Sequence, residues 1–390
     1  MQNGLRWLFL TLAVGCVGMP NAWAREHQKV RFATYNIQEL SREKLDQVDA
    51  MSRGTHPQLC KAAEIVQRMQ PEVLLINEID YDFDTKGQNA KLFRDRYLAV
   101  SQNGQKPLAF TEIVFEPVNT GVPSGQDFNN NGKTDDPEDA FGFGKYPGQY
   151  GMALYSIHPV QKNKIHTFRN LLWKDVPGNL LPDGANGRPQ WYAPAQVAVF
   201  RLSSKSHWDV PITVKSRTIH FLCSHPTPPV FDGAEDRNGR RNHDEIRLWA
   251  DYLSGGDRAQ YIKDDSGKPS SLPATESFIV MGDLNAEPLR GDLVEGKRPI
   301  DLLLKHARVA DPKPQSEGAE EANGPAIAGY KAFRSHNFGR LDYVLPSKDL
   351  AVAGTGVFWP KKGTAERALI DPPNEASDHR LVWLDVLLSP

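Results

Sequence analysis

Short, continuous apolar runs that end in polar residues recur along the chain. One run, residues 278–281, is closed by Gly282 and followed by Asp283 and Asn285. It predicts a buried strand that delivers an acid and an amide into a loop. Side chains two positions apart along a strand share one face, so both groups can point at one target. An anionic base beside a neutral hydrogen-bond donor suits a phosphoryl group attacked by water, although a plain polar turn is the alternative for this motif alone.

The same pattern opens the chain's folded part. An alternating segment at 29–37 brings Asn36 to its end, an apolar run at 73–76 leads to Glu78, and a helical pattern at 58–69 lies between them. Strand, helix, strand within about 50 residues is the usual α/β unit. Further strands are predicted at 151–156, 158–168, 196–202, 218–223, 341–345 and 380–388, and helices at 242–253 and 300–306.

The domain organisation is predicted from the distribution along the chain of the polar residues that follow the strands. Residues 118–150 are rich in Gly, Asn, Asp and Pro and predict a long insertion outside the core. The chain shows no internal repeat and no low-complexity linker, and its candidate site residues run from Asn36 to His379. We therefore expect one domain, residues 25–390, to build one site.

Composition narrows the range of substrates. Hydrophobic residues make up 39% and charged residues 24%, as in ordinary globular proteins. The 46 basic and 48 acidic residues give a formal net charge of −2. No bulk field would gather nucleic acid, so a small or membrane-borne phosphate ester is at least as compatible as DNA.

The N-terminus predicts export. Arg6 precedes an apolar segment at 8–17, and small residues follow at the spacing that a signal peptidase needs. We interpret residues 1–24 as a signal peptide, with a mature chain from Arg25 that is secreted or periplasmic. A lipid-anchored form cleaved before Cys16 is a weaker alternative, and the run is too short to span a bilayer of about 30 Å. The mature chain shows no other stretch of membrane-spanning length.

Two cysteines remain in the predicted mature chain, Cys60 and Cys223. Export permits a disulfide between them, and two buried thiols is an equal interpretation. The residues alone leave this choice open.

Six motifs give the chain a family resemblance. They are "ATYNI", "LLINEID", "CSHP", "MGDLNAEP", "GRLDYVLPS" and "SDHRLV". In order and spacing they resemble the endonuclease/exonuclease/phosphatase family, which includes secreted DNases, apurinic-site nucleases, sphingomyelinases and inositol-phosphate phosphatases. The resemblance implies a DNase I-like α/β fold: a four-layer sandwich of two mixed β-sheets with helices outside. It also implies a divalent-metal phosphoesterase.

The metal ligands implied by the resemblance carry side-chain oxygens. Glu78 would be the main ligand, with Asn36 and Asp378 assisting. Hard oxygen ligands of this kind suit Mg²⁺ or Mn²⁺. A single carboxylate at a strand end is more often simply solvated, so the expectation depends on the whole set.

The resemblance implies a catalytic role for five further residues. Asp283 would activate or orient the attacking water, and Asn285 would hold a phosphoryl oxygen. Asp342 would pair with His379 beside the scissile phosphate, and His225 is a candidate acid or phosphate ligand. How the role of general base divides between acid and imidazole stays open.

Two segments depart from the family's common pattern. A proline-rich loop after His225 brings Arg237, Arg240 and Arg241, which could clamp further phosphate oxygens or be a solvated surface. A second segment fits the calcium-loop pattern and could instead be a plain turn cluster. Its candidate ligands are Asp127, Asn129, Asn131, Lys133, Asp135 and Glu138.

The sequence as a whole predicts a secreted, metal-dependent phosphoesterase acting on a small or lipid-derived ester. A secreted nuclease acting on DNA or RNA is the first alternative, and a catalytically silent, calcium-dependent binding protein on the same fold is the second. We expect a monomer with no obligate protein partner.

Overall fold

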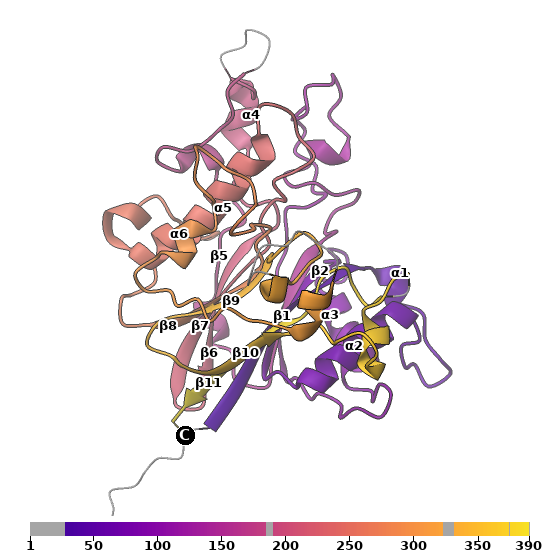
Figure 1. Ribbon diagram of the computed structural model, residues 1–390. Helices are drawn as coiled ribbons and strands as arrows, with labels where there is room; N and C mark the ends of the chain where they lie inside the picture. Colours follow the sequence, from indigo (N-terminus) through magenta and orange to yellow (C-terminus); the bar gives the residue numbers. More distant parts are fainter. Residues whose placement is uncertain (1–27, 185–189, 323–330, 374, 390) are drawn as a thin grey trace, which may run out of the picture.

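The computed structural model describes residues 28–184, 190–322, 331–373 and 375–389, and the predicted signal peptide lies outside them. Two β-sheets form its centre (Figure 1). The first has the order β10 (Ala351–Val357), β11 (Val382–Leu388), β1 (Gln28–Leu40), β2 (Val73–Ile79), β4 (Gly151–Ser156), β3 (Glu112–Val114). The second has the order β5 (His166–Thr167), β6 (His207–Val214), β7 (Arg217–Ser224), β8 (Ser277–Asp283), β9 (Asp342–Pro346). Parallel pairs, β1 with β2 and β7 with β8, make both sheets mixed.

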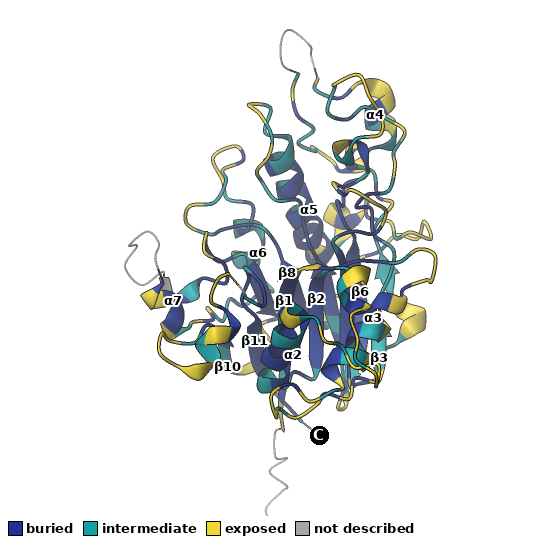
Figure 2. Ribbon diagram, turned by 90° about the vertical axis from the view of Figure 1, so that its right-hand side faces the viewer, coloured by how far each residue is buried: buried dark blue, intermediate teal, exposed yellow. Residues whose placement is uncertain are grey.

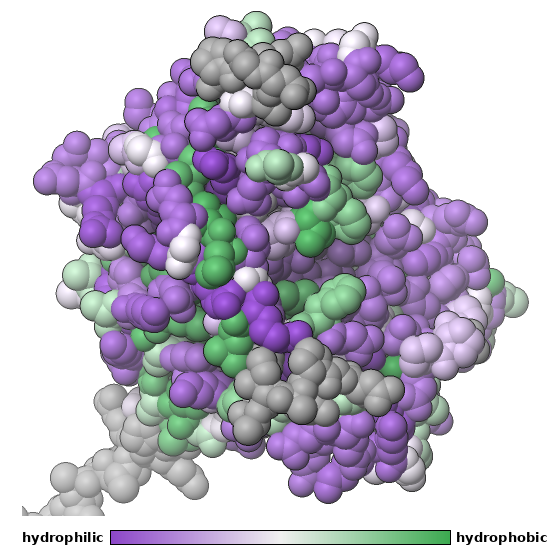
Figure 3. All heavy atoms as spheres, turned by 45° about the horizontal axis from the view of Figure 1, so that its top comes forward, coloured by the Kyte–Doolittle hydropathy of each residue, from purple (hydrophilic) through white to green (hydrophobic). Residues whose placement is uncertain are grey.

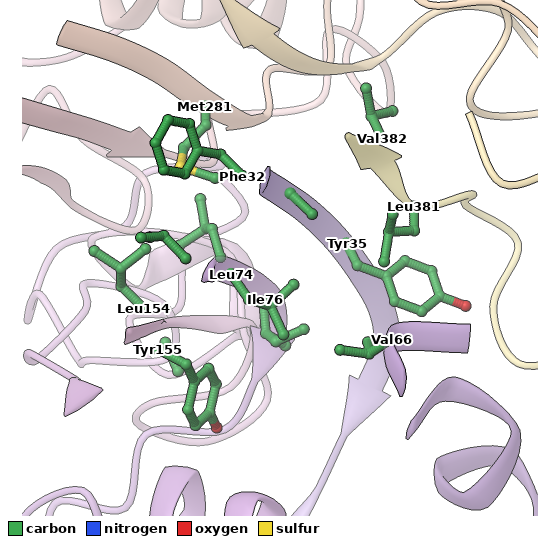
Figure 4. Packing of buried hydrophobic residues seen from close by; sticks show 14 of the residues in the cluster. Phe32, Tyr35, Val66, Leu74, Ile76, Leu154, Tyr155, Met281, Leu381 and Val382 are labelled. Carbon is green, nitrogen blue, oxygen red and sulfur yellow. The ribbon is translucent and has the colours of Figure 1, made fainter. Parts of the chain in front are cut away.

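The sheets pack face to face through side chains that alternate along each strand. In β8, Ile279 and Met281 belong to the core between the sheets, whereas Phe278 and Val280 belong to the core on the outer face. Both faces are buried, which explains why this strand is a continuous apolar run. Figure 4 shows Met281 and Phe32 of β1 in the same cluster.

Helices cover the outer faces of both sheets. The apolar side of α2 (Pro57–Met69) shares a core with the first sheet, and that of α5 (Arg237–Ser254) shares a core with the second. Figure 2 shows the buried strands between these helices. The other α-helices are short: α1 (Arg42–Leu45), α3 (Gln88–Phe93), α4 (Pro194–Val199), α6 (Asp301–Leu304) and α7 (Glu317–Glu321). The predicted four-layer sandwich is confirmed.

Two predicted strands are wrong. Residues 196–202 begin inside α4, because Pro194 occupies the first turn and the Gln196 side chain accepts the Ala193 N–H at 2.5 Å. Residues 158–168 contain only the two-residue β5. The strand beside β7 is instead β6, where polar His207 and Asp209 interrupt the apolar pattern although both are buried.

The insertion at 118–150 is attached to the segment that precedes β6. The Asn119 N–H donates to the Lys205 carbonyl at 2.9 Å, and its side chain donates to the Ser203 carbonyl at 2.8 Å. The insertion contains one short 3₁₀ turn, Pro137–Asp139. It is therefore an ordered loop held against the start of β6.

Both cysteines of the described chain are free thiols, with Cys223 buried and Cys60 half-buried. This decides the question that the sequence left open in favour of two thiols. Within the described ranges, no helix has the length and apolar character needed to cross a membrane.

Candidate functional site

The ends of β1, β2 and β8 bring three predicted site residues into direct contact. The Asn36 side-chain amide donates to Glu78 Oε1 at 2.9 Å and to Asp283 Oδ2 at 3.1 Å. Asn36 and Asp283 are buried, and Glu78 is half-buried. One amide thus joins the first sheet to the second at the proposed site.

Local distortions of the backbone orient these side chains toward one another. Glu78 has φ +65°, and the pairing of β2 with β4 shifts register between Asn77 and Ile79. A bulge of this kind re-aims a side chain and is typical of functional sites. In β8, Gly282 has φ +139°, and a Cβ atom there would lie 2.0 Å from the Ser224 carbonyl. Only glycine lets the ends of β7 and β8 approach closely enough for the residues that follow them to meet.

Asp283 lies between two imidazoles. His225 Nε2 is 3.5 Å and His379 Nε2 is 3.6 Å from Asp283 Oδ2. His379 Nδ1 is 2.8 Å from Asp342 Oδ2, and Asp342 pairs with Asp283 across the β8–β9 ladder. The arrangement is a buried acid–imidazole cluster with His379 between two carboxylates.

The two imidazoles have opposite charge preferences. Burial opposes the charged form of His379, but the carboxylates of Asp342 and Asp283 overcome it and raise its pKa to about 10. Burial lowers the pKa of His225 well below its usual value, and the charges of Lys205 and His379 lower it further. At neutral pH, His379 is a proton donor and His225 is a neutral imidazole.

Burial also raises the pKa of Asp283 to about 7, against the charge of His379. Its second oxygen accepts the Asn285 N–H at 3.0 Å, and Asn285 has φ +51°. The Asn285 amide donates to the Pro226 carbonyl at 3.1 Å, directly after His225. Asp283 and Asn285 therefore reach the same part of the site, as the spacing predicts.

Asp378 is tied to the same strand ends. Ser377 Oγ donates to the Asn36 carbonyl at 2.7 Å, which places Asp378 next to the end of β1. His336 Nε2 lies 3.6 Å from Asp378 Oδ2, and its ring lies 4.7 Å from the His379 ring. Burial opposes ionisation of Asp378, but the His336 hydrogen bond and the His379 charge lower its pKa.

The three arginines of the α5 start have different surroundings. Arg241 is buried, and its guanidinium donates to the carbonyls of Leu202, Phe141 and Arg201. Arg237 pairs with Glu235, and Arg240 lies 3.7 Å from an exposed aspartate. Arg241 thus fastens the insertion to α5 through its Nε and Nη2 atoms.

The predicted calcium loop forms a turn closed by its own backbone. Asp127 accepts the N–H groups of Asn131 and Gly132 at 3.0 and 2.8 Å. Asn131 accepts the N–H of Lys133 at 2.9 Å, and Asn129 accepts that of Asn131 at 3.1 Å. The last two predicted ligands, Asp135 and Glu138, are exposed.

Sequence patterns did not identify three residues of the site. His336 lies in a loop without periodicity, Ser377 is a small polar residue, and Lys205 follows two serines at the edge of a poorly patterned strand. Each is recognisable only from contacts with residues far along the chain.

Comparison with known families finds a match over most of the chain. A model described as the Endonuclease/Exonuclease/phosphatase family matches residues 33–379. The chain belongs to this family. No curated protein matches it.

Several solved structures are similar to this chain at low sequence identity. An endonuclease/exonuclease/phosphatase from Beutenbergia cavernae DSM 12333 is 17% identical, with a TM-score of 0.51 over 93% of this chain and 72% of that chain. The mannosyl-6-phosphatase Bt3783 of Bacteroides thetaiotaomicron VPI-5482 is 11% identical, with a TM-score of 0.46 over 92% and 100%. TDP2 from Caenorhabditis elegans is 15% identical, with a TM-score of 0.42 over 93% and 75%.

Membership confirms the family predicted from the six motifs, and the Beutenbergia structure supports the same arrangement of two mixed sheets with flanking helices. The family's name covers nucleases and phosphatases. Hydrolysis of phosphate esters is therefore the general activity that this membership supports.

Proposed function

We propose that the protein is a divalent-metal-dependent phosphoesterase that uses an activated water for in-line attack on phosphorus. The observation that carries the proposal is the meeting of Asn36, His225 and His379 around one carboxylate oxygen of Asp283, at 3.1 to 3.6 Å. A buried acid with a pKa near neutrality is suited to take a proton from water at working pH.

Each residue of the cluster has a role in this reaction. Asp283 takes the proton of the attacking water, and Asn285 turns its amide to a phosphoryl oxygen. The His379 imidazolium, oriented by Asp342, offsets the developing negative charge and supplies a proton to the departing oxygen. His225, which is neutral, accepts or donates a hydrogen bond on the opposite side of Asp283.

The proposed metal ligands carry the oxygen donors that a hard cation prefers, and Asp378 is ionised. The Asn36 oxygen accepts the Gln38 N–H at 2.9 Å while its NH₂ group contacts Glu78, so the amide would turn over to bind the cation beside Glu78 and Asp378. When bound, Mg²⁺ or Mn²⁺ would act as a Lewis acid on the phosphoryl oxygens. The Glu39 N–H donates to Glu78 Oε2 at 3.1 Å, which orients the carboxylate.

We propose a small or lipid-derived ester as the substrate. The near-zero net charge supports this choice over nucleic acid. Two exposed aromatic side chains also support it: Phe231, 88% exposed, follows His225 by six residues, and Phe338, 76% exposed, stacks 4.9 Å from the His336 ring. Figure 3 shows hydrophobic side chains around a hollow on the face turned forward from the top of Figure 1. An apolar group of the substrate would contact such side chains.

Two accompanying proposals concern the setting of the enzyme. We propose export of a mature chain from Arg25, supported by the N-terminal pattern. We also propose one structural Ca²⁺ in the loop from Asp127 to Glu138, supported by its spacing of oxygen ligands. A higher melting temperature in Ca²⁺ than in chelator, lost in Asp127→Asn, would support the calcium site. Equal melting temperatures would refute it.

The function is tested with purified residues 25–390 and four substrates: bis-p-nitrophenyl phosphate, p-nitrophenyl phosphate, plasmid DNA and sphingomyelin vesicles. Each is incubated with Mg²⁺, Mn²⁺ or chelator, beside Asp283→Asn. We expect metal-dependent hydrolysis of the small or lipid ester that the variant loses. Preferred cleavage of plasmid would establish the nuclease instead, and no hydrolysis of any substrate would favour a binding protein.

A further inference from the structure

Lys205 is a buried cation at the edge of the site. Its side chain is 6% exposed and lies in the segment between the insertion and β6. The ammonium donates to the Pro226 carbonyl at 3.4 Å, which is a long contact. Within the described ranges, no carboxylate lies within 4.0 Å of the Lys205 Nζ atom. One weak acceptor therefore serves three N–H donors.

The carboxylate nearest in the fold is already engaged. Glu245 of α5 accepts the N–H and the hydroxyl of Ser204 at 2.7 and 3.0 Å. Its other oxygen accepts the Thr227 N–H at 2.7 Å. Glu245 thereby fixes the segments that carry Lys205 and Pro226, without pairing with the ammonium.

The surroundings of Lys205 differ from those of the nearby buried cation Arg241. Arg241 donates to three carbonyl oxygens at 2.6 to 2.9 Å, so its buried charge is well compensated. A buried ammonium without such partners is costly, and an anion that paired with it would relieve this cost. Burial lowers the pKa of Lys205, and the nearby carboxylates of Glu245, Glu78 and Asp283 oppose this shift.

The position of Lys205 indicates which anion would pair with its ammonium group. The Pro226 carbonyl accepts from both Lys205 Nζ and the Asn285 amide, at 3.4 and 3.1 Å. Both donors therefore contact the same carbonyl oxygen, which belongs to the residue that follows His225. A phosphoryl group held by Asn285 would offer its non-bridging oxygens to the ammonium as well.

We propose that Lys205 is a catalytic residue whose ammonium binds a non-bridging oxygen of the substrate phosphate and stabilises the charge of the transition state. The proposal rests on the function proposed above for the same site. It makes Lys205 a second phosphate-binding donor beside Asn285. The ammonium is already buried at the site before the substrate arrives, so little reorganisation is needed.

The experiment uses Lys205→Met, which keeps the length of the side chain and removes its charge, and Lys205→Arg, which keeps the charge. Lys162→Met is the control, because it also removes one positive charge. Lys162 lies at the far end of β6 and β7, where Gln161 contacts Thr213 and Thr218. Melting temperatures are measured across a titration of inorganic phosphate, with Mg²⁺ and with chelator, and kcat and KM are measured with bis-p-nitrophenyl phosphate.

We expect phosphate to stabilise the wild type and Lys162→Met equally. Lys205→Met should bind phosphate about 10- to 100-fold more weakly, as expected for the loss of one charge-assisted hydrogen bond. Its kcat should fall about 10²- to 10³-fold, and Lys205→Arg should recover part of this loss. Without phosphate, Lys205→Met should melt at or above the wild-type temperature, because an uncompensated buried charge is removed.

Two outcomes would overturn the inference. They are equal phosphate affinity of Lys205→Met and wild type, whatever the melting temperature of the variant, and no phosphate binding by the wild type. If the wild type hydrolyses no ester but binds phosphate through Lys205, the proposed function fails and the phosphate site stands.

Discussion

The site has two halves that differ in how far their side chains are buried and held by contacts within the protein. In the acid–imidazole half, the side chains of Asp283 and Asp342 are 2% and 0% exposed, and each contacts His379. In the metal half, the Asp378 side chain is 36% exposed and Glu78 is half-buried. The first half is fixed by contacts within the fold, whereas the second presents oxygen atoms toward solvent.

This difference predicts how substitutions in each half should affect activity. Buried, mutually hydrogen-bonded groups lose function when one partner changes, because the others are left uncompensated. Solvent-facing carboxylates can be changed with less disturbance of the fold, and the loss should appear in metal affinity. Substitutions in the two halves should therefore give distinct kinetic signatures.

The largest effect is expected for Asp283→Asn. The substitution keeps the shape of the side chain and removes the acid that takes the proton from water, so kcat should fall toward the upper end of about 10²- to 10⁴-fold. Steady-state hydrolysis of bis-p-nitrophenyl phosphate at saturating Mg²⁺ measures it. A kcat within the wild-type range would remove Asp283 from the chemistry.

Glu78→Gln should instead weaken metal binding. The Mg²⁺ concentration for half-maximal activity should rise by more than the about 10- to 100-fold typical of groups that only support a metal ligand. The variant should regain activity at high Mg²⁺, and circular dichroism should show an unchanged fold. Loss of kcat at every Mg²⁺ concentration would place Glu78 in the other half.

Asp342→Asn should change the charge of His379. Burial opposes the charged form of His379, but the carboxylates of Asp342 and Asp283 raise its pKa to about 10, so removing the Asp342 charge should lower this pKa and reduce kcat about 10²-fold. Because the folded pKa is the raised one, the stabilisation is complete below pH 6.5 and is lost as the pH rises through 10. NMR titration of the imidazole measures the pKa. An unshifted His379 would contradict the pairing.

The smallest effect is expected for His336→Gln. His336 Nδ1 accepts the Phe338 N–H at 3.1 Å, so the proton of the neutral ring is on Nε2, which faces Asp378. Its loss should weaken Mg²⁺ affinity by about 10-fold and leave kcat at saturating Mg²⁺ unchanged. His220→Gln is the matched control, because His220 contacts Asp209 at 2.7 Å on the second sheet, away from the site. Equal effects of both variants would make the role of His336 structural.

The parts of the site that sequence predicted are those with a local signal. Asp283 follows a fully buried strand closed by a glycine, and Asn36 and Glu78 end apolar runs of the other sheet. The family resemblance then supplied the roles. The apolar runs predicted an α/β unit, and the family resemblance implied the four-layer sandwich.

The remainder could not be predicted, because its signals are tertiary. Residues 196–199 alternate like a strand, but Pro194 and the capping contact of Gln196 favour a helix. Lys205 and His336 are recognised as site residues only by their contacts with Pro226 and Asp378, which follow them by 21 and 42 positions along the chain. No periodicity in a single stretch encodes such a contact.

The division between the two halves is tested most directly by calorimetric titration of Mn²⁺ into the wild type, Glu78→Gln and Asp283→Asn, followed by turnover of bis-p-nitrophenyl phosphate by the same samples. We predict that Glu78→Gln loses Mn²⁺ binding, whereas Asp283→Asn binds Mn²⁺ like the wild type and does not turn over. Unchanged binding by Glu78→Gln, or loss of binding by Asp283→Asn, would contradict the assignment of the metal to the strand ends of β1 and β2.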